Sequence, residues 1–424
     1  MKIFKFGGAS IKNTSGIRNV SKIIKNNADS LLIVVSALGK TTNHLEELLD
    51  VCYYNKPDKE LLFSQIKKEH FAILNELFNA DAKDIFEEIE HLFHALYDHI
   101  QGGFSENFDF EYDQIISYGE LISSKMLYFY LQSMNIPVVW VDARQIIRTD
   151  NAYREGHVDW EKTIKKTKKI IEPHYQGEDK RTVITQGFIG GTSEGFTTTL
   201  GREGSDFSAA IFGFSLDAES VTIWKDVEGL LNADPKFFPD TVKLDRIPYR
   251  EAIELAYYGA SIIHPKTLQP LQNKNIPLYV KSFINAQGEG SVIHDFGIKR
   301  LMPCYIVKRE QVLISISPKD FSFIAEDNLS TIFGLFAFFG VKINLMQNSA
   351  ISFSLCVDNK EKIDALIEEL QTEFYVKYNS DVELFTIRYY DRNSIDRITK
   401  DRTVILEQKN RTTVQYIIRK KQLT

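Results

Sequence analysis

Short strand-forming runs alternate with helix-forming stretches over about the first 285 residues of this chain. The clearest run, Leu31–Val35, consists of apolar residues only, as in strands that are buried on both faces. Similar runs lie at 2–6, 138–142, 182–191, 221–226 and 277–280. Between them, apolar residues at helical spacing mark 14–28, 43–135, 160–171, 207–214 and 249–258. The alternation predicts an α/β domain with a mostly parallel sheet sandwiched by helices.

The pattern changes after about residue 300. A strand at 312–316 and a helix near 328–340 are followed by strands at 343–346 and 351–357 and a helix at 361–374, the ferredoxin-like order. The remaining strands, 382–388, 403–407 and 413–419, have no obvious helix between them. The glycine-bearing stretch Ala286–Ser291 is a candidate linker. We therefore expect a first domain at 1–296 and an α+β region at 297–424 whose second half is truncated.

Composition and charge exclude several kinds of protein. The formal net charge of -6 leaves no basic surplus to neutralise phosphates, so nucleic acid is not expected as a partner. The apolar runs are too short to span a membrane, and no membrane partner is expected. Met1 leads directly into the first strand, which predicts that there is no signal peptide. We expect a cytoplasmic protein.

The cysteines and histidines do not predict a metal site. Cysteine occurs at three scattered positions without metal-ligand spacing, which indicates buried thiols in a reducing compartment: Cys52, Cys304 and Cys356. A group of histidines in the helical region has no acidic or cysteine partner at suitable spacing, and we assign it to a solvated helix face: His91, His94 and His99.

The first strand ends in two glycines, Gly7 and Gly8, just after Lys5. Glycines at the end of a strand let backbone N–H groups approach a ligand, and a helix beyond them favours an anion. For this stretch alone, an ordinary strand and turn with a surface lysine remains the alternative. The segment Gly39-Lys40-Thr41 is not a P-loop, because that motif requires a glycine where Val34 stands.

Polar loops follow the predicted strands. In a parallel sheet the carboxyl ends of the strands face one crevice, where ligands bind. The loops supply cations, hydroxyls and carboxylates, namely Lys5, Arg202, Lys225, Ser36, Thr42, Thr197–Thr199, Glu120 and Asp206. This set suits phosphoryl transfer from a nucleotide, where catalysis is mainly positioning and charge neutralisation. An acceptor that is itself a carboxylate needs no general base, since it is already ionised at pH 7.

Several segments, in this order, closely resemble the aspartate kinases of the amino-acid kinase superfamily. They are Lys5–Ser10, Ser117–Glu120, Thr185–Gly190, Thr197–Asp206, Trp224–Gly229, Asp234-Pro235 and Gly259–Pro265. The resemblance covers about the first 285 residues and implies the amino-acid kinase fold. A weaker similarity to paired ACT regulatory domains covers the rest and implies a homodimer.

The resemblance also implies a role for each site residue. Lys5 would neutralise the transferring phosphoryl group, and Asp206 would orient the lysines rather than act as a base. Arg202 would grip a carboxylate of L-aspartate, and Glu120 would accept its ammonium group. Ser36 and Thr42 would line the same pocket. The nucleotide, ATP with Mg²⁺, would lie along Lys5, Gly7, Gly8, Lys225, Asp226 and Lys236. For Asp206, capping of the helix it precedes is the structural alternative.

The chain departs from the family at three nucleotide-site positions. The family commonly has threonine at Lys225, lysine at Ser261 and arginine at Lys236. We hypothesise that Lys225 replaces the cation missing at Ser261. Ala9 for threonine is a milder change, since the backbone N–H is retained.

The C-terminal region departs further. Ala325–Leu329 stands where lysine-inhibited relatives have a glycine-bearing loop, and Asn344 stands where an aspartate would hold the effector's amine. We expect dimerisation through this region with altered or absent inhibition by lysine. Two other functions stay open besides aspartate phosphorylation. One is a kinase for glutamate or an N-acylated amino acid, and the other is a catalytically weak amino-acid sensor.

Overall fold

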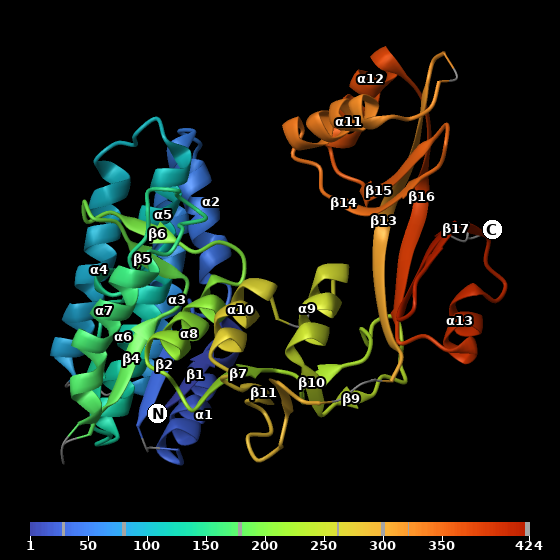
Figure 1. Ribbon diagram of the computed structural model, residues 1–424. Coiled ribbons are helices and arrows are strands. Elements are labelled where there is room, and N and C mark those ends of the chain that lie inside the picture. Colours follow the sequence, from blue (N-terminus) through green and yellow to red (C-terminus); the bar gives the residue numbers. More distant parts are fainter. Residues whose placement is uncertain are drawn as a thin grey trace. The chain divides into compact units, whose positions relative to one another are not determined.

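The computed structural model describes residues 1–27, 30–78, 82–176, 180–260, 263–297, 302–320 and 322–419. The chain forms two compact units (Figure 1). The described residues of Met1–Leu230, Lys243–Ile253 and Ile263–Gly297 make up the first, and those of Leu231–Val242, Glu254–Ile262 and Ile298–Thr424 the second. No described helix is both long enough and apolar enough to cross a bilayer.

An eight-stranded sheet forms the centre of the first unit, in the order β10-β12-β11-β7-β1-β2-β4-β3. Neighbouring strands are parallel except for the pair β11 and β12. The strands are β1 (Lys2–Phe6), β2 (Leu31–Val35), β3 (Val138–Trp140), β4 (Thr182–Gln186), β7 (Ser220–Lys225), β10 (Arg246–Pro248), β11 (Leu278–Ser282) and β12 (Ser291–His294). The predicted α/β domain with a mostly parallel sheet is confirmed.

Helices cover both faces of this sheet. Leu31, Ile33 and Val35 join a core with residues of α1 to α6, while α8 packs on β1 and β7 and against α10. The helices of the first unit are α1 (Thr14–Lys25), α2 (Thr41–Tyr53), α3 (Lys59–Leu77), α4 (Lys83–Gln101), α5 (Phe108–Ile116), α6 (Tyr118–Ser133), α7 (Trp160–Ile171), α8 (Gly204–Ser215) and α10 (Pro265–Asn273). Short 3-10 helices are η1 (Gly8–Ser10), η2 (Ala143–Gln145) and η3 (Glu172–Tyr175). Helix α9 (Tyr249–Tyr258) has residues in both units.

The predicted single strand at 182–191 is wrong. Strand β4 ends at Gln186, and Phe188 has a φ of 68°, which breaks the extended backbone. Beyond it, β5 (Ile189–Gly191) pairs antiparallel with β6 (Thr197–Thr199) in a separate two-stranded sheet. Another short pair is β8 (Leu230–Leu231) with β9 (Lys243–Leu244).

The second unit contains a six-stranded antiparallel sheet in the order β14-β15-β13-β16-β18-β17. Its strands are β13 (Cys304–Pro318), β14 (Ile343–Asn348), β15 (Phe353–Asp358), β16 (Phe374–Arg388), β17 (Val404–Lys409) and β18 (Thr413–Arg419). Helices α11 (Glu326–Phe338) and α12 (Lys362–Glu373) pack on the half formed by β13, β14 and β15. The predicted ferredoxin-like order is confirmed for this half.

The two halves of this sheet repeat one arrangement. Residues 311–318 of β13 pair with 374–382 of β16 in the first half, and 304–308 pair with 384–388 in the second. In the second half, β17, β18, β16 and β13 take the positions that β14, β15, β13 and β16 take in the first. Two strands of 15 residues therefore serve both halves.

The second half, in which the sequence shows no obvious helix, contains one short helix. Helix α13 (Arg392–Thr399) lies there, and the Asp391 side chain caps it by accepting from the Ser394 N–H. The helix is short and mostly polar, with Ile395 and Ile398 turned toward a core that includes Phe385. No second helix of this half occurs among the described residues, because β18 runs to Arg419.

Candidate active site

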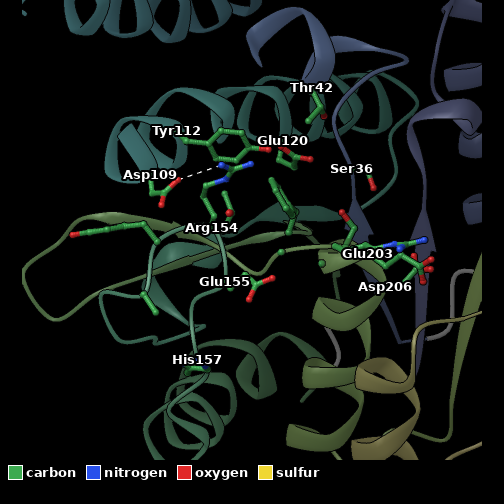
Figure 2. A pocket seen from close by; sticks show the side chains of 18 of the residues that line it. Ser36, Thr42, Asp109, Tyr112, Glu120, Arg154, Glu155, His157, Glu203 and Asp206 are labelled. Carbon is green, nitrogen blue, oxygen red and sulfur yellow. Dashed lines mark hydrogen bonds and ion pairs between the residues drawn. The ribbon is translucent and has the colours of Figure 1, made fainter. Parts of the chain in front are cut away.

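A cavity of about 930 Å³ lies in the first unit, at the carboxyl ends of parallel strands (Figure 2). Most of the predicted site residues line it, namely Lys5, Ser36, Thr42, Glu120, Arg202, Asp206 and Lys225. Lys5 lies next to the end of β1, Ser36 directly follows β2 and Lys225 ends β7. Because β1 lies between β2 and β7, these residues come from three adjacent strands.

Asp206 lies between two lysines. Its Oδ1 is 2.6 Å from Lys5 Nζ, and its Oδ2 is 4.0 Å from Lys225 Nζ. The Lys5 and Asp206 side chains are only 12% and 6% exposed, so each charge needs the other as a partner. Asp206 belongs to the first turn of α8, whose N-cap residue, Glu203, makes no side-chain capping bond. The geometry favours orientation of the lysines by Asp206 over the helix-capping alternative.

Glu120 is a buried carboxylate on the first turn of α6. Its Oε1 accepts a hydrogen bond of 3.0 Å from the Ala37 N–H. Its Oε2 is also buried and has no hydrogen-bond partner among the described residues. Burial raises the pKa of Glu120 to about 8, against the opposing effects of the Ala37 N–H and the Lys5 charge. A cationic ligand would supply the missing partner for this oxygen.

Arg202 is exposed and lines the cavity. In the part of the chain that the structure describes, no hydrogen bond or ion pair of its side chain is found. Gly201, just before it, has a φ of 73°, a conformation that favours glycine. A guanidinium that lines the cavity suits a ligand carboxylate.

The two glycines after β1 do not line the cavity. A Cβ on Gly8 would lie 2.7 Å from the Ala37 oxygen and 2.8 Å from the Gly39 oxygen, too close for any side chain. A Cβ on Gly7 would lie 3.4 Å from Lys5 Nζ. Neither glycine has a positive φ. The stretch therefore needs glycine at position 8 for close backbone approach to the next strand's loop, rather than for a special turn.

The remaining predicted nucleotide-site residues are not brought into the cavity. Asp226 is exposed and follows β7. Lys236 lies in the segment Leu231–Val242 of the second unit, where its N–H donates to Asp234. Ser261 lies outside the described residues.

Sequence reasoning missed one wall of the cavity. Asp109 and Tyr112 of α5 line it, as does Arg154 of the loop at 150–157. Asp113, which is fully buried behind this wall, accepts hydrogen bonds from the Arg154 N–H and from Thr199, and burial raises its pKa to about 6. No local pattern marks these residues, because their contacts join segments far apart in the sequence.

The described residues contain no group of three or more His, Cys, Asp or Glu side chains that could hold a metal ion. His99, one of the histidines that we expected on a solvated helix face without an acidic partner, pairs with the buried Glu111 at 2.7 Å.

The comparisons with known proteins identify the family. The family model "Amino acid kinase family" matches residues 1–282, and the chain belongs to this family. Lysine-sensitive aspartokinase 3 of Escherichia coli (strain K12) is 29% identical over 361 residues, which cover 84% of this chain and 78% of that protein. A bifunctional aspartokinase/homoserine dehydrogenase 2 of Arabidopsis thaliana is 29% identical over 389 residues, 88% of this chain. The chain spans only 42% of that relative's length.

Solved structures of aspartate kinases are also similar to this chain. Aspartokinase III of E. coli, in complex with aspartate and ADP, is 25% identical with a TM-score of 0.82, and the match covers 99% of this chain and 96% of that one. Aspartate kinase of Clostridium acetobutylicum, 21% identical with a TM-score of 0.78 over 99% and 96% of the two chains, shares the fold. The predicted resemblance to aspartate kinases is confirmed.

Proposed function

We propose that this chain is an ATP-dependent aspartate kinase, which phosphorylates the side-chain carboxylate of L-aspartate to give 4-phospho-L-aspartate and ADP. The observation that carries the proposal is the placement of Glu120, with its unpartnered Oε2, in the same cavity as the Lys5–Asp206 pair. The Glu120 carboxylate suits an ammonium group, and Lys5 of the Lys5–Asp206 pair suits a phosphoryl group. The similarity to aspartokinases supports the same assignment.

The reaction needs no catalytic base. An oxygen of the aspartate side-chain carboxylate attacks the γ-phosphorus, the bond from that phosphorus to the bridging oxygen breaks, and ADP leaves with the electron pair. No proton is transferred, so the barrier comes mainly from bringing two anions together. Lys5 and Lys225 would screen this repulsion, and Asp206 would hold both ammonium groups in place.

The aspartate acceptor would be held by its ammonium group and by the carboxylate that does not react. Glu120 would accept the ammonium, and Arg202 would grip the carboxylate that does not react. Ser36 and Thr42 would complete the pocket. An N-acylated amino acid lacks the positive charge that Glu120 requires, which disfavours that alternative substrate.

ATP with Mg²⁺ would bind beside Lys5, along Gly7, Gly8, Lys225 and Asp226, the predicted nucleotide-site residues of the first unit. Mg²⁺ usually binds through substrate phosphates and few protein ligands, which fits the lack of a ligand cluster among the described residues. Bound Mg²⁺ would neutralise charge on the phosphates. Lys225, close to Asp206, would supply the cation that the family places at Ser261.

The wider setting follows from the same proposal. The product would enter lysine, threonine and methionine biosynthesis in the cytoplasm, and the second unit, our candidate for an ACT-like regulatory region, would form a homodimer. In that unit Asn344 accepts from Lys308 Nζ at 2.7 Å and donates to Gln311 and Asp358, both at 2.8 Å. The Asn344 side chain is already engaged, which supports altered or absent inhibition by lysine.

A hydroxamate assay tests the function directly. Acyl phosphate formed from L-aspartate, L-glutamate or N-acetyl-L-glutamate is trapped with hydroxylamine in the presence of ATP and Mg²⁺. We expect product with aspartate alone. Product with another acceptor would assign a different kinase, and binding of aspartate without product would indicate the amino-acid sensor.

A further inference from the structure

Arg154 occupies a backbone conformation that glycine adopts at lower cost. Its φ is 67°, in the left-handed region, where a non-glycine residue is uncommon and strained. Residues in such conformations persist where the surroundings hold them, and they concentrate at functional sites. Arg154, the residue with this strained backbone, lines the cavity.

A buried carboxylate holds the strained backbone in place. The Arg154 N–H donates to Asp113 Oδ2 at 2.9 Å, and the same oxygen accepts from the Thr199 N–H at 2.9 Å. Thr199 Oγ1 donates to Asp113 Oδ1 at 2.6 Å. Asp113 thus ties the loop of Arg154 to the segment that leads from Thr199 to Arg202.

The two loops also touch through their backbones. A Cβ on Gly201 would lie 3.2 Å from the Arg154 oxygen, and the Gly156 N–H donates to the Thr199 oxygen at 2.9 Å. Gly201 directly precedes Arg202, so Arg154 and Arg202 leave adjoining backbone and line the same cavity. Both arginines therefore border the cavity in which the acceptor would bind.

The Arg154 side chain is oriented but keeps free donors. Its Cζ lies 4.4 Å from the centre of the Tyr112 ring, and its Nη1 is 3.2 Å from Asp109 Oδ1 (Figure 2). The Tyr112 hydroxyl donates to Glu46 at 2.6 Å, which holds the ring. A guanidinium has five N–H donors, and the pair with Asp109 is made through one nitrogen. These two contacts orient the guanidinium and leave other donors for a ligand.

We propose that Arg154 is a second acceptor-binding arginine, which acts with Arg202 on the carboxylate that is not phosphorylated. The inference rests on the proposed function. An amino dicarboxylic acid carries one carboxylate that must meet the γ-phosphoryl group and one that must be kept away from it. Two guanidinium groups hold the second carboxylate more specifically than one, because each contributes directed, charge-assisted donors.

The test compares Arg154→Gly with the wild-type chain on two acceptors. Glycine accepts the left-handed backbone, so the variant removes the side chain without disturbing the loop. L-Aspartate and its α-amide, which lacks the unreactive carboxylate, are the acceptors. We expect the KM and the calorimetric Kd for aspartate to rise about 10- to 100-fold, the loss of a charged hydrogen bond. The kcat, the KM for ATP and the KM for the α-amide should change by less than about twofold.

Asn135→Gly is the matched control, since Asn135 is exposed, has a φ of 57° and does not line the cavity. It should leave all the constants unchanged. An unchanged Kd for aspartate in Arg154→Gly, or an equal effect on both acceptors, overturns the inference. A wild-type chain that binds aspartate but does not phosphorylate it refutes the proposed function instead. A wild-type chain that does not bind aspartate refutes both.

Discussion

The buried carboxylate of Glu120 makes a quantitative prediction about pH. Its pKa is raised to about 8 by burial, and only the ionised form can pair with an ammonium group. At pH 7 about one tenth of the free protein has Glu120 ionised, so the apparent affinity for aspartate is about tenfold below its limit. At pH 8 the deficit is about twofold, and at pH 9 it is negligible.

The direction of the pH dependence follows from the protonation state of Glu120 that binds the ammonium group. A raised acid pKa means that the free site holds a proton which ligand binding must expel, so affinity increases as the pH rises toward 9. We expect the KM for aspartate, at saturating ATP, to fall about fivefold between pH 7 and pH 8 and by less than about twofold between pH 8 and pH 9. Initial rates of ADP release measure this directly. The KM for ATP, which does not involve Glu120, serves as an internal reference.

Two controls isolate Glu120. Glu120→Gln cannot ionise, so it should raise the KM for aspartate and remove its decrease between pH 7 and pH 8. Succinate has both carboxylates of aspartate but no amine, and its inhibition constant should not improve over the same range. A flat KM for aspartate in the wild type, or the same steep decrease in Glu120→Gln, would refute the assignment of Glu120 to the ammonium.

Other predictions address the nucleotide side and the regulatory unit. Lys225→Ala should lower kcat about a hundredfold with little change in stability, because a cation beside the transferring group is lost; an unchanged rate would contradict its assigned role. Gly8→Ala should lower the free energy of unfolding by about 1–3 kcal/mol in chemical denaturation, because its Cβ would overlap two carbonyl oxygens. Gly297→Ala should have no effect, because among the described residues no atom beyond its chain neighbours lies within 4 Å of the added Cβ. Equal free energies of unfolding for the two variants would show that the loop of Ala37 and Gly39 shifts to accommodate the added Cβ. Millimolar lysine should leave activity unchanged, because Asn344 is already engaged; steep inhibition would refute this.

Elements with a strong local signal could be predicted from the sequence. Leu31–Val35 and Trp160–Ile171 have in the structure the bounds that their composition predicts. The site residues at the ends of strands could also be found, because a parallel sheet brings the loops after its strands to one edge. Lys5, Ser36 and Lys225 line one cavity for this reason.

Features that depend on distant contacts could not be predicted. Arg154 is held by Asp113, 41 residues away, and Asp113 reaches Thr199 across 86 residues. Neither the positive φ of Phe188 nor that of Arg154 is suggested by residue type, since both are residues that avoid this conformation. The short helix α13 was missed because its few apolar residues form no long periodic pattern.

Three buried carboxylates around the cavity differ in how their oxygens are satisfied, and this difference separates their roles. Asp113 accepts three hydrogen bonds from the protein, so its charge is used within the fold. Asp206 is paired with Lys5 and lies near Lys225, so it controls cations that remain directed at the cavity. Glu120 has one oxygen engaged by Ala37 and one with no partner among the described residues. An unsatisfied buried oxygen is costly, and a ligand that satisfies it recovers that cost on binding. Among these three carboxylates, Glu120 is therefore the one whose removal should act chiefly on acceptor affinity.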